Sequence, residues 1–293
     1  MTPAIGILLA LGCALISNLA FFYKYRGANE RPRVDIRRPL WTVKSLYSSK
    51  WFTIGMLIAT GSWGLHVAAL ALAPMSVVQV ALAAGVVFIA VMAERMLGCE
   101  VGRRQWLGLW LMALGLAVLG LTAPAVHGAD SHFSTVPMIA FEAGFFGVGG
   151  LLIVGPRVRG ASEHHGVMLG AAAGVLFGVS DTSIKALTGI LSEHGALSVL
   201  LSPWLAFAIA ASVLAFYASA RGLQDGDAVP VIAVTGTAAN IAGIASGLIV
   251  FGDPMPAGAV GIVLESLAFV LVLVSAAMMP APVRAAGLAP AES

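Results

Sequence analysis

The feature that most constrains this chain is a series of long apolar runs that contain almost no charged side chains. A helix needs about 20 mostly apolar residues to cross the hydrocarbon core of a bilayer. Composition agrees with membrane insertion, because 59% of the residues are hydrophobic and only 10% are charged, against roughly a quarter charged in soluble proteins. The sequence therefore predicts an all-α integral membrane protein. The nine expected transmembrane helices are residues 3–23, 51–73, 75–97, 105–124, 135–155, 166–189, 199–220, 228–251 and 257–279.

The basic residues are distributed asymmetrically across the predicted membrane. Eight of them, beginning with Lys24, are assigned to the polar loop 24–50, and with nine helices only Lys185 lies inside the membrane while all the others lie on one side. Cytoplasmic loops carry an excess of Lys and Arg. We therefore expect a multi-pass plasma membrane protein with its amino terminus outside and its carboxyl terminus in the cytoplasm. The 24–50 loop is read as facing anionic lipid headgroups, so the expected partner is the lipid bilayer and no nucleic acid.

Internal similarity divides the chain into two halves. The run "WGLHVAALALAPMSVVQV" has the layout of "VLAFYASARGLQDGDAVPVI", and "LALGCALISNLAFFYK" loosely matches "GAAAGVLFGVSDTSIK". One helix separates the two four-helix units, so the second unit is inverted in the membrane, an arrangement found in many transporters. The expected organisation is a first repeat (1–124), a linking helix (125–160), a second repeat (161–280) and a disordered cytoplasmic tail (281–293).

Several motifs carry a family resemblance. The segment "APMSVVQVALAAGVVFIAVMAERMLGCEVGRRQW" resembles the closing helix pair of an EamA-type repeat in the drug/metabolite transporter (DMT) superfamily, with "AERM" at the usual Gly-Glu-Arg turn. Its counterpart, "VFGDPMPAGAVGIVLESLAF", keeps the acidic residue and lacks the basic one. The chain resembles the NIPA-like branch in three features. These are a polar 24–50 loop in place of one of the usual ten helices, the segment "GSWGLHVAALALAPMSVVQ" and the segment "SDTSIKAL". The resemblance implies a transporter, and known members of that branch are linked to magnesium transport.

Ionisable side chains inside the membrane are functional candidates, because they are costly to bury there. Each candidate also has a structural interpretation. Asp181 and Lys185 are four residues apart, so they can neutralise each other within one helix, and Lys185 can snorkel to the outer surface. Acidic and amide groups can equally serve as interhelical hydrogen-bonding groups, as we expect for Asn18 and Gln79. The candidates for substrate binding or coupling are His66, Glu142, Asp181, Lys185, Glu265 and Asn240.

The glycines, the cysteines and the net charge of the intramembrane acids give three further expectations. Gly166, Gly170, Gly174 and Gly178 recur every four residues, so they form a stripe on which a second helix can approach closely, for packing or for sliding. Cys13 and Cys99 have no spacing typical of a disulfide or metal site and are interpreted as structural. If the three intramembrane acids face one cavity, the net charge there is negative and favours a cation such as Mg²⁺.

The hypothesis from the sequence is a DMT-type secondary transporter that moves a small cationic or polar solute by alternating access, with NIPA-like Mg²⁺ transport as the alternative. An intramembrane enzyme acting on lipid is a remote alternative, because no metal motif such as H-E-x-x-H occurs. The pair of histidines in "SEHHG" (162–166) is interpreted as solvated. We expect no catalytic residues and no cofactor, and leave open the metal ligands and whether the chain forms a homodimer.

Overall fold

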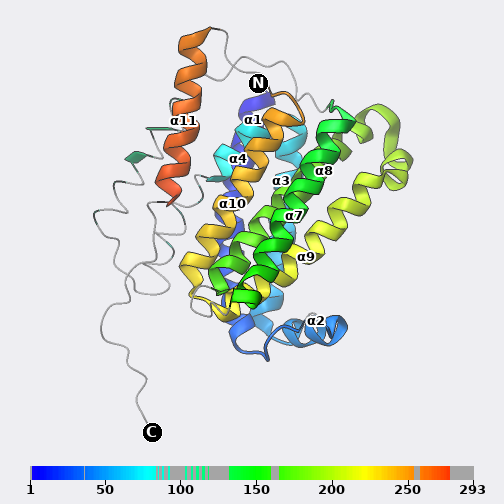
Figure 1. Cartoon of the computed structure of the whole chain (residues 1–293), viewed down its shortest axis with the longest axis vertical. Helices are drawn as coiled ribbons and strands as arrows, with labels where there is room; N and C mark the ends of the chain where they lie inside the picture. Colours follow the sequence, from blue (N-terminus) through cyan, green and yellow to red (C-terminus); the bar gives the residue numbers. More distant parts are fainter. Residues whose placement is uncertain are drawn as a thin grey trace.

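A computed structural model describes residues 2–35, 37–83, isolated positions between 85 and 118, and residues 132–159, 165–253 and 258–277. Every regular element in these ranges is an α-helix (Figure 1). Six of these described helices are long and apolar enough to cross a membrane, so the chain is a multi-pass membrane protein whose described part is all-helical. The six spans are Ala4–Asn29, Lys50–Leu72, Thr135–Gly155, His165–Leu201, Pro203–Asp225 and Pro230–Ile249.

The helices follow the predicted order along the chain. Most of the predicted helices 75–97 and 105–124, and the whole of the predicted tail 281–293, lie outside the described residues. The described helices are α1 (Thr2–Asn29), α2 (Pro39–Tyr47), α3 (Lys50–Leu72), α4 (Met75–Ala83), α7 (Thr135–Arg159), α8 (His165–Leu201), α9 (Pro203–Asp225), α10 (Ala228–Ile249) and α11 (Ala259–Ala277).

Two helices are longer than the apolar runs that predict them. α1 continues through Asn29, beyond the predicted end at residue 23, and α8 continues to Leu201, beyond residue 189. Hydropathy marks only the part of a helix that suits hydrocarbon, whereas Lys, Arg, Leu and Glu sustain helical hydrogen bonding in water. α8 breaks locally at Gly195, whose φ of 80° and ψ of 177° are outside the helical range. The polar loop predicted to begin at residue 24 is therefore shorter than expected and contains a helix, α2.

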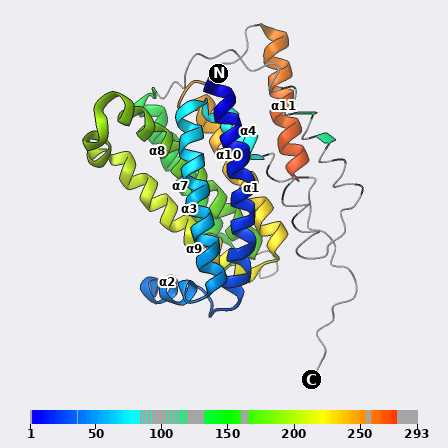
Figure 2. The same ribbon diagram turned by 180° about the vertical axis from the view of Figure 1, so that it is seen from behind.

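The long helices form one bundle, with α1 packed along α3 and α8 packed along α9 (Figures 1 and 2). α4 packs against α10 between these pairs, and α7 packs against α8. α2 lies across the lower end of the bundle in Figure 1, at the opposite end from the amino terminus. Segments from both halves of the chain therefore meet at the centre of the molecule.

The glycine stripe on α8 is the surface that contacts α10. A Cβ atom on Gly174 would collide with the backbone carbonyl oxygen of Thr235, and one on Gly178 would collide with the side chain of Ala242. The predicted close approach of a second backbone is confirmed. Contacts of this kind are typical of helix pairs in membranes, where small residues permit tight van der Waals packing.

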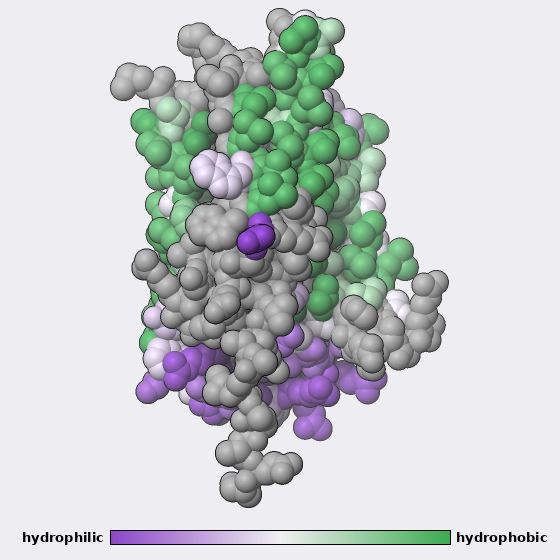
Figure 3. Space-filling view, turned by 90° about the vertical axis from the view of Figure 1, so that its left-hand side faces the viewer, coloured by the Kyte–Doolittle hydropathy of each residue, from purple (hydrophilic) through white to green (hydrophobic). Residues whose placement is uncertain are grey.

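The two ends of the bundle differ in chemistry. At the basic end, Asp225 accepts from Arg221 Nε at 2.6 Å and lies 3.2 Å from a guanidinium nitrogen of Arg33 and 3.0 Å from His165 Nδ1. This cluster joins the start of α8 and the end of α9 to the segment after α1. The interpretation of "SEHHG" as solvated is wrong for His165, because α9 brings a carboxylate against its ring. In Figure 3 hydrophilic residues gather at this end and apolar residues cover most of the described surface above it.

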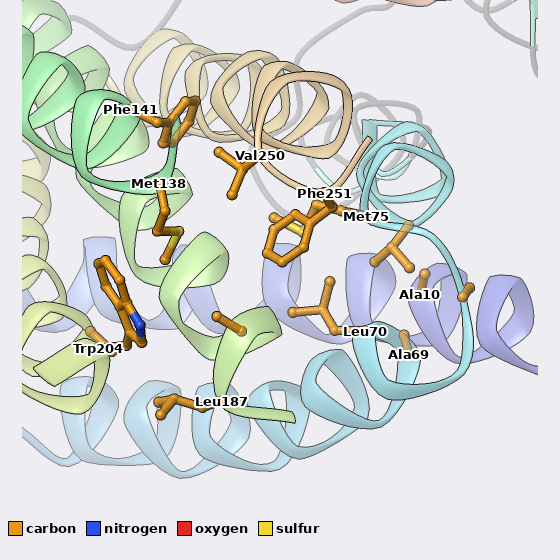
Figure 4. Close-up of a cluster of buried hydrophobic side chains, with 14 of the residues drawn as sticks. Ala10, Ala69, Leu70, Met75, Met138, Phe141, Leu187, Trp204, Val250 and Phe251 are labelled. Carbon is orange, nitrogen blue, oxygen red and sulfur yellow. The ribbon is translucent and has the colours of Figure 1, made fainter. Parts of the chain in front are cut away.

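The opposite end is closed by a packed apolar core. Leu70, Met75, Met138 and Phe251 are buried there and come from α3, α4, α7 and the segment after α10 (Figure 4). Asp253 is also buried at this end, and its carboxylate accepts from the backbone N–H of Ser76 at 2.7 Å. An acid at this position satisfies one of the free amides at the amino end of α4. The halves of the chain are thus joined at both ends of the bundle.

Candidate functional site

A cavity of about 240 Å³ lies among α1, α3, α4, α8 and α10. The lining positions on each helix are spaced so that they share one face, as residues 59, 63 and 66 do on α3 and residues 177 and 181 do on α8. The polar lining side chains are Cys13, Ser17, Asn18, Lys24, Trp63, His66, Gln79, Asp181, Thr235 and Asn240.

Asp181 is the one acidic side chain among the described lining residues. Its Oδ1 lies 3.0 Å from His66 Nε2, and its Oδ2 accepts from Gln79 Nε2 at 3.2 Å. The His66 contact has the distance of an ion pair, although the ring N–H does not have hydrogen-bond geometry toward the carboxylate. The side chain of Asp181 remains 16% exposed. The carboxylate is therefore held by two helices while still facing the cavity.

Several buried polar atoms beside Asp181 have no hydrogen-bond partner among the described residues. They include Gln79 Oε1 and His66 Nδ1. Buried polar atoms in folded proteins are normally paired with protein groups or ordered water, so these atoms are suited to water molecules or to a hydrated solute. Asn240, which is buried, and Thr235 add further polar groups from α10.

Lys24 places a positive charge in the same cavity. Its ammonium group lies 3.8 Å from the centre of the Phe21 ring, a cation–π contact. The end of the first apolar run predicts that Lys24 lies in the polar loop, and this prediction is wrong because α1 continues past it. The cavity is therefore not lined by acids alone. Its net charge depends on Asp181, on Lys24 and on whether His66 is protonated.

Lys185 does not share the surroundings of Asp181. It is 0% exposed, and its ammonium group donates to the backbone carbonyls of Leu70 at 2.6 Å and Ala73 at 3.1 Å. These carbonyls end α3, where helices leave acceptors without an internal partner. The expectation that Lys185 snorkels outward is wrong, because α3 and the apolar core enclose it. The carboxylate of Asp181 contacts His66 and Gln79, so its polar contacts differ from those of Lys185 with the carbonyls of α3.

Glu142 is 1% exposed and is not among the cavity-lining residues. Its Oε1 accepts from Ser183 Oγ at 2.8 Å, which joins α7 to α8. Glu265 belongs to α11, and its side chain lies outside the described residues. Of the six predicted site residues, the structure brings together His66, Asp181 and Asn240. The sequence left open whether the three intramembrane acids face one cavity, and Glu142 on α7 is turned toward Ser183 on α8, outside the lining of this cavity.

Several residues that line this cavity were not among the six predicted site residues. Gln79 was expected to join helices, and it does so by donating to Asp181, which makes it part of the site. Cys13 and Ser17 lie four residues apart on α1 and both approach the hydroxyl of Ser62. This i, i+4 spacing of small polar residues on an apolar helix was a usable signal. Asn18 donates to the backbone carbonyl of Gly85 at 2.8 Å, which confirms its expected role between helices.

The fold and the cavity define a polytopic helical membrane protein with a charged site among its helices. A curated relative, the "Probable magnesium transporter NIPA9" of Arabidopsis thaliana, is 22% identical over 284 residues, covering 94% of this chain and 81% of its own length. This comparison confirms the resemblance to the NIPA-like branch indicated by the sequence motifs. No family model matches the chain. No solved structure matches it either.

Proposed function

We propose that this protein is a secondary transporter that carries a small cation through the Asp181 cavity by alternating access, with Mg²⁺ as the favoured cargo. The observation that carries the proposal is the Asp181 carboxylate, which faces a cavity among the helices of the bundle. A buried acid that still reaches open space is costly unless it serves a function. The similarity to a relative named as a magnesium transporter favours Mg²⁺ over an organic cation.

The composition of the site suits a hydrated ion that binds transiently. Among the described residues no cluster of three or more His, Cys, Asp or Glu side chains could hold a bare metal. Mg²⁺ keeps several of its waters in protein sites, and six waters occupy about 180 Å³, less than the 240 Å³ of the cavity. Those waters would donate to Asp181 and to Gln79 Oε1. The ammonium group of Lys24 weakens cation binding, which favours release.

The inverted repeat is part of the proposal. Under it, nine helices form two four-helix units around α7, so that α1 and α3 correspond to α8 and α9, and α4 corresponds to α10. The packing supports this correspondence, since α1 lies along α3, α8 lies along α9, and α4 meets α10 at the centre. In the matching stretches quoted above, Lys24 and Lys185 occupy equivalent final positions. Rocking of one unit against the other would open the cavity to each side in turn.

The proposed orientation places the basic end of the bundle in the cytoplasm. Leu40 on α2 and Ser134 before α7 are both exposed and lie on opposite sides of the membrane in this orientation. In a background without Cys13 and Cys99, Ser134→Cys should react with an impermeant maleimide in intact cells, and Leu40→Cys only after permeabilisation. The reverse pattern would place the amino terminus inside.

Flux measurements test the function directly. The purified protein, reconstituted in proteoliposomes with an internal Mg²⁺ indicator, should show saturable Mg²⁺ entry that increases when the interior is made negative. Choline and methylammonium serve as organic cation controls. Uptake of these amines without Mg²⁺ uptake would support the proposed transport activity and reject Mg²⁺ as the cargo. No uptake of any cation, with the protein correctly folded and inserted, would reject the proposal.

A further inference from the structure

A second cavity, of about 330 Å³, lies between α3 and α9 and adjoins the Asp181 cavity. The two cavities share Lys24, Ala59, Trp63 and Phe177. We call the second cavity the α3–α9 groove. Trp63 and Thr60 stand at its rim and are exposed on the outer surface of α3. The groove therefore faces the lipid side of the bundle, and it lacks the polar groups around Asp181, which line the first cavity alone.

The lining of the groove is amphipathic along its length. Phe52, Met56, Trp63, Phe177 and Phe216 supply apolar and aromatic surface. The α3 positions that line it run from residue 52 to residue 63, about 16 Å at 1.5 Å per residue. This length is about half of the roughly 30 Å hydrocarbon core. The groove thus spans the depth of one leaflet, on the side of the bundle's basic end, and its size is in the range of small-molecule sites.

Lys24 supplies a positive charge at the basic end of the groove. Its side chain packs against Gly55, about one turn from the start of α3, where the methylene stem leaves no room for a Cβ atom. Within the described part of the chain its ammonium group has no ion pair with a carboxylate, and its contact is with the Phe21 ring. A cation at this depth calls for an anion, and basic pockets between transmembrane helices are suited to acidic lipid headgroups.

We propose that the α3–α9 groove binds an anionic phospholipid of the leaflet at the basic end, with one acyl chain along the apolar lining and the phosphate on Lys24. Charge complementarity selects the headgroup, and the aromatic and Met side chains accept the chain. Neutral lipid fills the same surface without the contact to Lys24. The site does not depend on which cation the protein carries or on whether it carries one.

Lipid competition on the purified full-length protein tests this site. Native mass spectrometry compares retention of phosphatidylglycerol and phosphatidylcholine with identical acyl chains. Wild type should favour the anionic lipid about fivefold, the effect of one Lys near an acidic membrane surface. Lys24→Gln should remove this preference. Lys50→Gln is the matched control, because Lys50 is exposed at the same end, outside the groove, and lies over Trp51; it should keep the preference.

Two further arms keep the proposal falsifiable if Lys24→Gln folds poorly. Lys24→Arg should keep the preference, and Thr60→Phe, which fills the exposed rim, should lower retention of phosphatidylglycerol while Lys24 is intact. Glycerol phosphate, a headgroup without chains, should not displace the lipid. Equal retention of the two lipids by wild type would overturn the proposal, as would equal loss in Lys24→Gln and Lys50→Gln. Displacement by glycerol phosphate would overturn it in favour of a simple phosphate site.

Discussion

Asp181 and Lys185 lie one helical turn apart on α8, yet they belong to two different regions of the molecule. Asp181 faces a cavity and contacts the side chains of His66 and Gln79. Lys185 is enclosed by the packed end of the bundle and donates to main-chain carbonyls of α3. Both groups are costly in a membrane, but only one of them has open space beside it. The comparison teaches that the surroundings of a charge, rather than its presence in a span, separate a site from a structural contact.

The largest expected effect is on flux when the carboxylate at the cavity is lost. Asp181→Asn should reduce Mg²⁺ flux in proteoliposomes by about tenfold or more, because a charged ligand is replaced by a neutral one. Glu142→Gln is the matched control. It keeps an acceptor for Ser183 outside the cavity, so it should retain most of the flux. Similar losses of flux in the two variants would mean that the cavity around Asp181 is no more important for transport than the buried contact of Glu142.

The next largest effect concerns stability at the packed end. Lys185→Met leaves the carbonyls of Leu70 and Ala73 without their donor, and it should lower the free energy of unfolding by about 2 kcal/mol. Thermal unfolding in detergent measures the change. Lys44→Met, on the exposed face of α2, should shift stability by less than about 0.5 kcal/mol. A Lys185→Met variant as stable as wild type would mean that water already reaches these carbonyls.

Glycine substitutions test the contact between α8 and α10. Asp181 and Lys185 both belong to α8. Gly174→Ala puts a methyl group against the carbonyl of Thr235, and it should destabilise the protein by about 1–3 kcal/mol through overpacking. On α7, a Cβ at Gly147 meets nothing within 4 Å. Gly147→Ala should therefore raise stability by about 0.5–1 kcal/mol, since Ala favours helix. If Gly174→Ala left the stability unchanged, α8 and α10 would have to separate easily, as a sliding contact requires.

The last test is a coupling energy, the difference between double-variant and single-variant effects, which sharpens the comparison. A double-mutant cycle of Asp181→Asn with His66→Gln should give a coupling in unfolding free energy of about 0.5–3 kcal/mol, because the residues are in contact. The cycle of Asp181→Asn with Lys185→Met should give a smaller coupling, because the polar contacts of these two side chains are with different groups. The sequence alone predicts the opposite, namely that the double variant recovers stability when a buried pair is removed together. Recovery in the second cycle would restore that pairing.

Much of the architecture could be read from local patterns. Apolar runs predict the starts of α3, α4 and α7 within a few residues, because the length needed to cross a bilayer is a property of the segment itself. The glycine stripe on α8 was also predictable, since its four-residue spacing fixes one face of the helix. Hydropathy missed the continuations of α1 and α8 because polar residues outside the hydrocarbon core can remain helical.

The candidate site required the tertiary structure. The sequence by itself determined that the chain is a helical membrane protein and identified the ionisable groups of its apolar runs, although it placed Lys24 of α1 outside the membrane. It did not determine which of them meet, because the lining residues come from five helices, from Cys13 on α1 to Asn240 on α10. The rotation of each helix about its own axis is fixed by packing against its neighbours. That rotation turned Asp181 toward His66, Lys185 toward the end of α3 and Glu142 toward Ser183.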